Sequence, residues 1–174
     1  MTPRLVSYYE VSILPCPDDF ESERNVQHHP RASDCVAVGV ATSTFNLRSR
    51  MPGWDIASYG YHGDDGGIFH GSGDMMRRFG PSFGEGDTVG CGIDYISRGI
   101  FFTLNGDFLG YGWTNVDLEF LQQDLYPTVG VDTNFPVECN FGERPFCFDL
   151  TFMVERQEHV VRACLNGNRD PPTV

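Results

Sequence analysis

The stretch from residue 51 to residue 66 gathers side chains that bind ligands or metals. It contains Trp54, His62 and the neighbouring carboxylates Asp64 and Asp65. An imidazole beside carboxylates has the donor types of a metal site or a general base. However, no second histidine lies at ligand spacing, and the chain has no G-x-S-x-G, P-loop or zincin motif. We therefore expect no catalytic residue, no metal and no cofactor, and we interpret the stretch as a binding surface.

Gly, Pro and Asp punctuate this stretch and predict two loops around a short strand over Ser58–Tyr61. Tryptophan and tyrosine are common interface anchors, and a pair of aspartates accepts hydrogen bonds from peptide N–H groups or binds a basic side chain. Each has a structural alternative. Trp54 would fill an edge of the fold, Tyr59 and Tyr61 would share a core-facing side of the strand, and Asp64-Asp65-Gly66 would only form a turn.

The elements that must hold these loops are short strands. In residues 6–13 apolar and polar side chains alternate, which predicts a strand with one buried face, and Asn105-Gly106 is typical of a type I′ hairpin turn. The predicted strands are Val6–Ile13, Cys35–Thr42, Ser58–Tyr61, Ile68–His70, Thr88–Asp94, Gly99–Leu104, Phe108–Tyr111, Pro127–Val131 and Val137–Phe141. Successive short strands without helices between them predict an all-β fold, an antiparallel β-sandwich.

The C-terminal part has a different pattern. Asp149 would cap a short helix from about Leu150 to Leu165, which Asn166-Gly167 would end. We therefore expect one domain over residues 1–148, followed by a C-terminal helix and tail over residues 149–174.

Charge and cysteine usage limit the partners and the compartment. The net charge of −12 repels phosphate backbones and anionic bilayers, so we expect no nucleic acid and no membrane as partner. The six cysteines form no CxxC pair, and no secretory apolar stretch opens the chain. Reduced thiols and a cytoplasmic, or nuclear, location follow as expectations, with a disulfide scaffold as the alternative.

Motifs in the predicted strands resemble those of the SPRY domain family and occur in the family's order from about residue 8 to residue 148. These motifs are Tyr8-Tyr9-Glu10-Val11, Val38-Gly39-Val40-Ala41, Gly86-Asp87 with Val89-Gly90-Cys91, Phe101-Phe102 followed by Asn105-Gly106, Leu125-Tyr126-Pro127, and Asn140-Phe141-Gly142. The segments Met51–Asp55, Ser58–Gly66 and Phe146–Leu150 are similar to the Ran-binding-protein-M type of that family. The resemblance implies a concanavalin-like jelly-roll sandwich.

It also implies a non-enzymatic protein-interaction module, a scaffold or adaptor linked to a ubiquitin ligase complex, whose partners are proteins or peptide motifs. In SPRY domains, loops at one end of the sandwich bind short peptide segments. Carried over to this chain, one wall would be Trp54, Tyr59, Tyr61, His62, Asp64 and Asp65, and the facing wall Trp113, Asp132, Thr133 and Asn134. Trp113 is expected to be the more exposed anchor, because glycine and threonine flank it.

Two departures from the family pattern lead to further expectations. Only seven residues precede Tyr8, so the sandwich is expected to lack edge strands there, and the loop Pro15–Asp34 is longer than in the family. A carbohydrate-binding, lectin-like sandwich is the alternative function, because aromatic rings beside Asp and Asn, often with calcium, also bind sugars.

Overall fold

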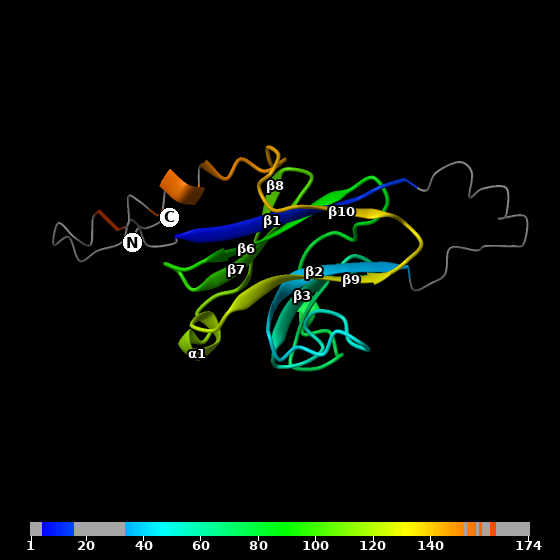
Figure 1. Ribbon diagram of the computed structural model, residues 1–174, viewed down its shortest axis with the longest axis horizontal. Helices are drawn as coiled ribbons and strands as arrows, with labels where there is room; N and C mark the ends of the chain where they lie inside the picture. The colour runs from blue at the N-terminus through cyan, green and yellow to red at the C-terminus, as the bar shows by residue number, and fades with distance from the viewer. Residues whose placement is uncertain (1–4, 16–33, 152, 156, 158–160, 163–174) are drawn as a thin grey trace, which may run out of the picture.

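Two antiparallel sheets of five strands each pack face to face in the computed structural model, which describes residues 5–15, 34–151, 153–155, 157 and 161–162 (Figure 1). The first sheet has the strand order β10 (Val137–Asn140), β1 (Val6–Ile13), β6 (Thr88–Asp94), β7 (Gly99–Leu104) and β8 (Asp107–Trp113). The second sheet has the order β5 (Arg77–Arg78), β4 (Gly67–His70), β3 (Ser58–His62), β2 (Cys35–Thr42) and β9 (Leu125–Asp132). The predicted all-β sandwich is confirmed.

All nine predicted strands are present, with ends that shift by a few residues. Two elements were missed: β5, which has only two residues, and the single-turn helix α1 (Leu118–Leu121), which Asp117 caps by accepting a hydrogen bond from the Glu119 N–H at 2.9 Å. The hairpin prediction is confirmed, since Asn105 and Gly106 join β7 to β8 with φ values of 51° and 86°.

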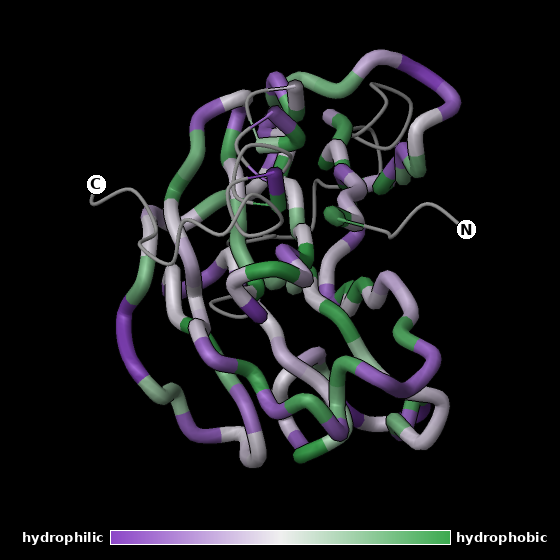
Figure 2. Tube along the Cα trace, turned by 90° about the vertical axis from the view of Figure 1, so that its left-hand side faces the viewer, coloured by the Kyte–Doolittle hydropathy of each residue, from purple (hydrophilic) through white to green (hydrophobic). Residues whose placement is uncertain are grey.

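The core lies between the sheets and follows the period-2 pattern of the strands. Tyr9, Val11 and Ile13 of β1 face Val36 and Val38 of β2 across it. The Tyr9 hydroxyl reaches the other sheet, where it donates to the Gly39 carbonyl at 2.7 Å and accepts from the Gly39 N–H at 3.0 Å. In the view of Figure 2, apolar and polar residues alternate along the trace, as strands with one core-facing side require.

The outer face of the first sheet is also covered, which the alternation in β1 did not predict. The segment after β10 packs Phe148 and Met153 against Phe101 of β7, with Tyr8 beside them. Glu10, 3% exposed, accepts hydrogen bonds from the backbone N–H groups of Cys147 and Phe148 at 2.9 and 3.0 Å. These contacts bury a face that a strand pattern alone assigns to solvent.

The C-terminal helix is confirmed for the residues that the structure describes. Asp149 accepts a hydrogen bond from the Thr151 N–H at 3.0 Å, as a cap does, and residues 151, 153–155, 157, 161 and 162 are helical. The rest of the predicted helix, the tail, most of the loop Pro15–Asp34, and Cys16 and Cys164 lie outside the described residues.

One edge of β1 is only half paired within the described part of the chain. Strand β10 pairs with Glu10 to Ile13 and leaves Val6 to Tyr9 without a partner strand on that side. Since Ile13 exchanges hydrogen bonds with the β6 side, strand alternation directs the backbone groups of Val6 and Tyr8 toward the open edge.

Candidate binding surface

The loop with Trp54 lies on the outer face of the second sheet. It can lie there because the strands beneath it carry glycines: a Cβ on Gly60 would be 2.0 Å from the Pro52 carbonyl oxygen, and one on Gly130 would be 2.7 Å from the Met51 sulfur. Ser58 anchors the loop by accepting a hydrogen bond from the Gly53 N–H at 2.8 Å. The glycines therefore leave room on the surface of the sheet for the loop that carries Trp54.

His62 lies beneath this loop and is 3% exposed. Its Nε2 is 2.8 Å from the Pro52 carbonyl oxygen, and its ring stacks on Phe69 at 4.0 Å between centroids and lies 6.2 Å from the ring of Trp54. Burial lowers the pKa of the His62 imidazole below its usual value, so the ring is neutral near pH 7. His62 thus supports the loop and does not face solvent.

The acidic residues gather at one end of the second sheet, where β2 begins and β3 and β9 end. Cys35 pairs with Asp132 across β2 and β9, and the Gly63 N–H bonds to the Val36 carbonyl, which brings Asp64 to the same end. Asp64 and Asp132 are exposed, and Asp65 is half-buried and accepts from the Gly67 N–H at 2.8 Å. We call Asp64, Asp65 and Asp132 the acidic rim. Thr133 and the exposed Asn134 follow it directly in the chain.

The other predicted site residues lie elsewhere, and this corrects the two-walled arrangement. Tyr59 and Tyr61 point into the core, where Tyr61 is fully buried and its hydroxyl donates to the Pro81 carbonyl, so neither ring is available to a ligand on the surface. Trp113 also packs against the core. Its ring centroid lies 4.9 Å from that of Tyr59, and its side chain is half-buried. It lies on the opposite side of the second sheet from Trp54 and does not form a facing wall.

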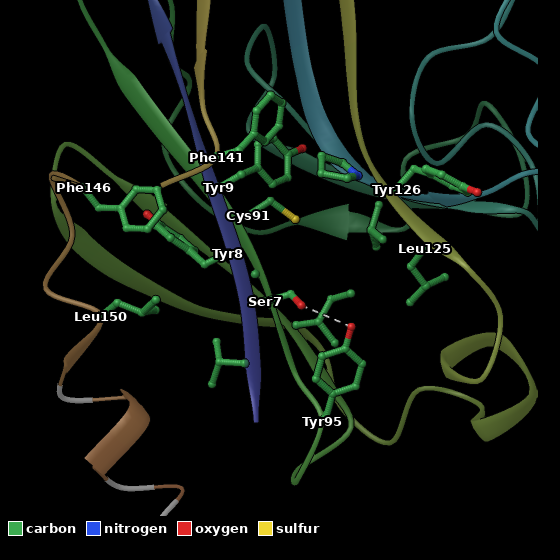
Figure 3. A pocket seen from close by; sticks show the side chains of 15 residues that line it. Ser7, Tyr8, Tyr9, Cys91, Tyr95, Leu125, Tyr126, Phe141, Phe146 and Leu150 are labelled. Carbon is green, nitrogen blue, oxygen red and sulfur yellow. Dashed lines mark hydrogen bonds between the residues drawn. The ribbon is translucent and has the colours of Figure 1, made fainter. Parts of the chain in front are cut away.

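A separate hollow, which the sequence did not indicate, lies between the open edge of β1 and strand β9 (Figure 3). Its volume is about 410 Å³, and several aromatic side chains line it, among them Tyr8, Tyr9, Tyr95, Tyr126 and Phe141. Tyr126 and Phe141 are 50% and 55% exposed at its mouth. The exposure of these two rings depends on the distance between the edges of the two sheets. A local sequence pattern carries no information on that distance.

Two antiparallel sheets that hold loops with aromatic and acidic side chains at their ends define a β-sandwich interaction module. The SPRY domain family model matches residues 6–144, and the chain belongs to this family. Within the described residues, no helix is long and apolar enough to cross a bilayer.

Relatives and solved structures agree with this family. Ran-binding protein 9 of Xenopus tropicalis is 46% identical over 116 residues, which are 66% of this chain and 20% of that protein. Ran-binding protein M homolog of Arabidopsis thaliana is 41% identical over 140 residues, 80% of this chain and 28% of that protein. The chain therefore spans less than a third of these relatives. A crystal structure of a human SPRY domain, 28% identical, superposes with a TM-score of 0.57 over 80% of this chain and 78% of that one.

Proposed function

We propose that this domain binds short peptide segments through the acidic rim and the loop around Trp54. The observation that carries the proposal is the convergence of three separate segments: the loop with Trp54, the turn after β3 with Asp64, and the end of β9 with Asp132. His62 lies between Trp54 and Asp64 and fixes their relative positions. Thr133 and Asn134, which follow Asp132, would extend this surface.

The rim favours a peptide with a basic side chain. Exposed carboxylates on a chain of net charge −12 attract cationic groups and repel anionic ones. The indole Nε1 of Trp54 is buried and has no hydrogen-bond partner among the described residues, so it can donate to a peptide carbonyl after a small side-chain movement. The surface thus offers one aromatic anchor, one N–H donor and several carboxylate acceptors.

We further propose that the domain serves as a scaffold or adaptor that presents such peptides to a ubiquitin ligase complex, in the cytoplasm or nucleus. The similarity to the Ran-binding proteins supports this role. We assign it no catalytic activity of its own. Co-precipitation of ligase subunits with the full-length protein, and their loss in an Asp64→Lys, Asp132→Lys double variant, would test the link.

The double variant Asp64→Lys, Asp132→Lys is expected to weaken binding of a basic peptide by about tenfold or more, which corresponds to about 1.4 kcal/mol. Two attractive contacts would become repulsive, while the fold would be kept because both side chains are exposed. Fluorescence polarisation against a library of labelled basic peptides measures the change.

The control is Asp107→Lys, an exposed carboxylate in the hairpin of the first sheet. If Asp107→Lys weakens binding as much per introduced lysine as the double variant does, binding depends only on the net charge and the rim is not the site. If the double variant binds as the wild type does, the surface is assigned wrongly.

Trp113→Ala is expected to lower stability and to leave the affinity of the folded domain unchanged, since this ring packs on the core away from the rim.

A further inference from the structure

Three side chains of different chemistry meet at the acidic rim, one of them the rim residue Asp64. The Cys35 sulfur, a ring nitrogen of His62 and a carboxylate oxygen of Asp64 all lie within 4.8 Å of one another. Cys35 and His62 are buried, whereas Asp64 is exposed. The Cys35 thiol donates a hydrogen bond to the Asp64 carboxylate at 3.3 Å.

Strand register explains why residues so far apart in the chain meet. Ala37 of β2 pairs with His62 of β3, so Cys35, two residues before Ala37, and Asp64, two residues after His62, continue the same register. Residues two apart on a strand share a face. Because Val36 and Val38 face the core, Cys35, His62 and Asp64 share the outer face of the second sheet.

The hydrogen bonding of the His62 imidazole is that of a metal-bound histidine. Its Nε2 bonds to the Pro52 carbonyl, which can only accept, so this nitrogen carries the proton and Nδ1 keeps its lone pair. A hydrogen bond from the second ring nitrogen to a backbone carbonyl is the usual support of a metal-bound histidine. No hydrogen bond involves Nδ1 within the described part of the chain, and the stacked ring of Phe69 limits rotation.

The charges around the cluster also suit a cation, because Asp64 is acidic and exposed and the Cys35 thiol already contacts its carboxylate. A bound cation would favour the thiolate and release one proton to solvent. The exposed Asp132, paired with Cys35 across β2 and β9, adds a second negative charge beside the cluster.

We propose that Cys35, His62 and Asp64 bind a Zn²⁺ ion, with the fourth position open to water or to the carboxylate of Asp132. Thiolate, imidazole and carboxylate are the ligand types that Zn²⁺ takes, whereas Ca²⁺ and Mg²⁺ require oxygen donors. A tetrahedral ion would draw the three ligands together from their present separations. The ion would fix the turn after β3 to the start of β2, at the Asp64 end of the rim.

Titration of the purified protein with Co²⁺ tests the proposal, because Co²⁺ reports the geometry and the ligands that Zn²⁺ would have. Wild type is expected to give tetrahedral visible bands and a near-ultraviolet thiolate-to-metal band, both of which Zn²⁺ abolishes by competition. Cys35→Ser is expected to lose the thiolate band, and Asp64→Asn, whose side chain is exposed, to weaken Co²⁺ binding at least about tenfold.

Cys147→Ser is the matched control, since Cys147 is a free, exposed thiol in another part of the structure. It is expected to keep the full spectrum, and Zn²⁺ is expected to raise the melting temperature of wild type and Cys147→Ser but not of Cys35→Ser. A thiolate band that survives in Cys35→Ser would place the thiolate elsewhere in the chain and overturn the proposal. So would the absence of any band in wild type that is folded by circular dichroism.

Discussion

An Asp94→Ala variant is expected to lose at least about 3 kcal/mol of unfolding free energy, because it leaves four donors, one buried and three partly buried, without an acceptor. Asp94 is fully buried at the end of β6. Its Oδ1 accepts from the backbone N–H groups of Ile96 and Ser97, at 2.9 and 3.0 Å. Its Oδ2 accepts from the Tyr111 hydroxyl at 2.7 Å and from the Gln157 amide at 2.6 Å.

This single carboxylate therefore joins a turn, strand β8 and the C-terminal helix. Urea unfolding followed by circular dichroism measures the loss, and for a chain of 174 residues we expect the melting temperature to fall by roughly 6–12 °C. Proteolysis under native conditions is expected to begin in the C-terminal segment, because that segment loses its buried anchor.

Asp94→Asn is the control that keeps shape and removes charge. The Oε1 of Gln157 is buried and has no partner among the described residues, so rotation of the Gln157 amide lets it accept from the amide that the substitution introduces. We expect a loss of about 1 kcal/mol. Equal stability of Asp94→Ala and wild type would show that the C-terminal segment does not depend on this acceptor.

A Gly60→Ala variant is expected to lift the Trp54 loop from the second sheet and to abolish peptide binding. The new Cβ would lie 2.0 Å from the Pro52 carbonyl oxygen, and a backbone atom cannot move aside as a flexible side chain does. Overpacking of this kind costs about 1–3 kcal/mol. The loop would also lose the contact between the Pro52 carbonyl and His62.

Tryptophan fluorescence measures the displacement when Trp54 is the only indole, so the change is made in a Trp113→Phe background. We expect a red-shifted emission and loss of peptide binding. Gly84→Ala serves as the control, because a Cβ there meets nothing within 4 Å. Unchanged emission and unchanged binding in Gly60→Ala would mean that the loop does not rest on Gly60.

The sequence predicted what depends on local patterns. Alternation in residues 6–13, the positive-φ pair Asn105-Gly106 and the cap Asp149 each report on neighbours within a few positions. The strand, the turn and the cap are all confirmed, although the strand is covered on both faces and not on one. The short strand β5 was missed because two arginines carry no periodicity. Membership in the SPRY family followed from motifs that lie in the strands and in the turns beside them.

The candidate site was less predictable, because its composition depends on pairing between distant strands. Tyr59 and Tyr61 share a face, as their spacing requires, but only the arrangement of the two sheets makes that face the core. The separation of Trp113 from Trp54 has the same origin. Cys35 could not be placed beside His62 from the sequence, because the register of β2 on β3 brings them together.

The half-open edge of β1 has a consequence for the fluctuations of the native state. Strand β10 holds the C-terminal half of β1, whereas in the described structure the segment Val6 to Tyr9 pairs with β6 alone. Local opening then costs least at the Val6 end, and β1 should fray from there toward Ile13. Amide hydrogen exchange should therefore alternate along β1, with Val6 and Tyr8 exchanging faster than Ser7 and Tyr9, and the alternation should vanish beyond Glu10.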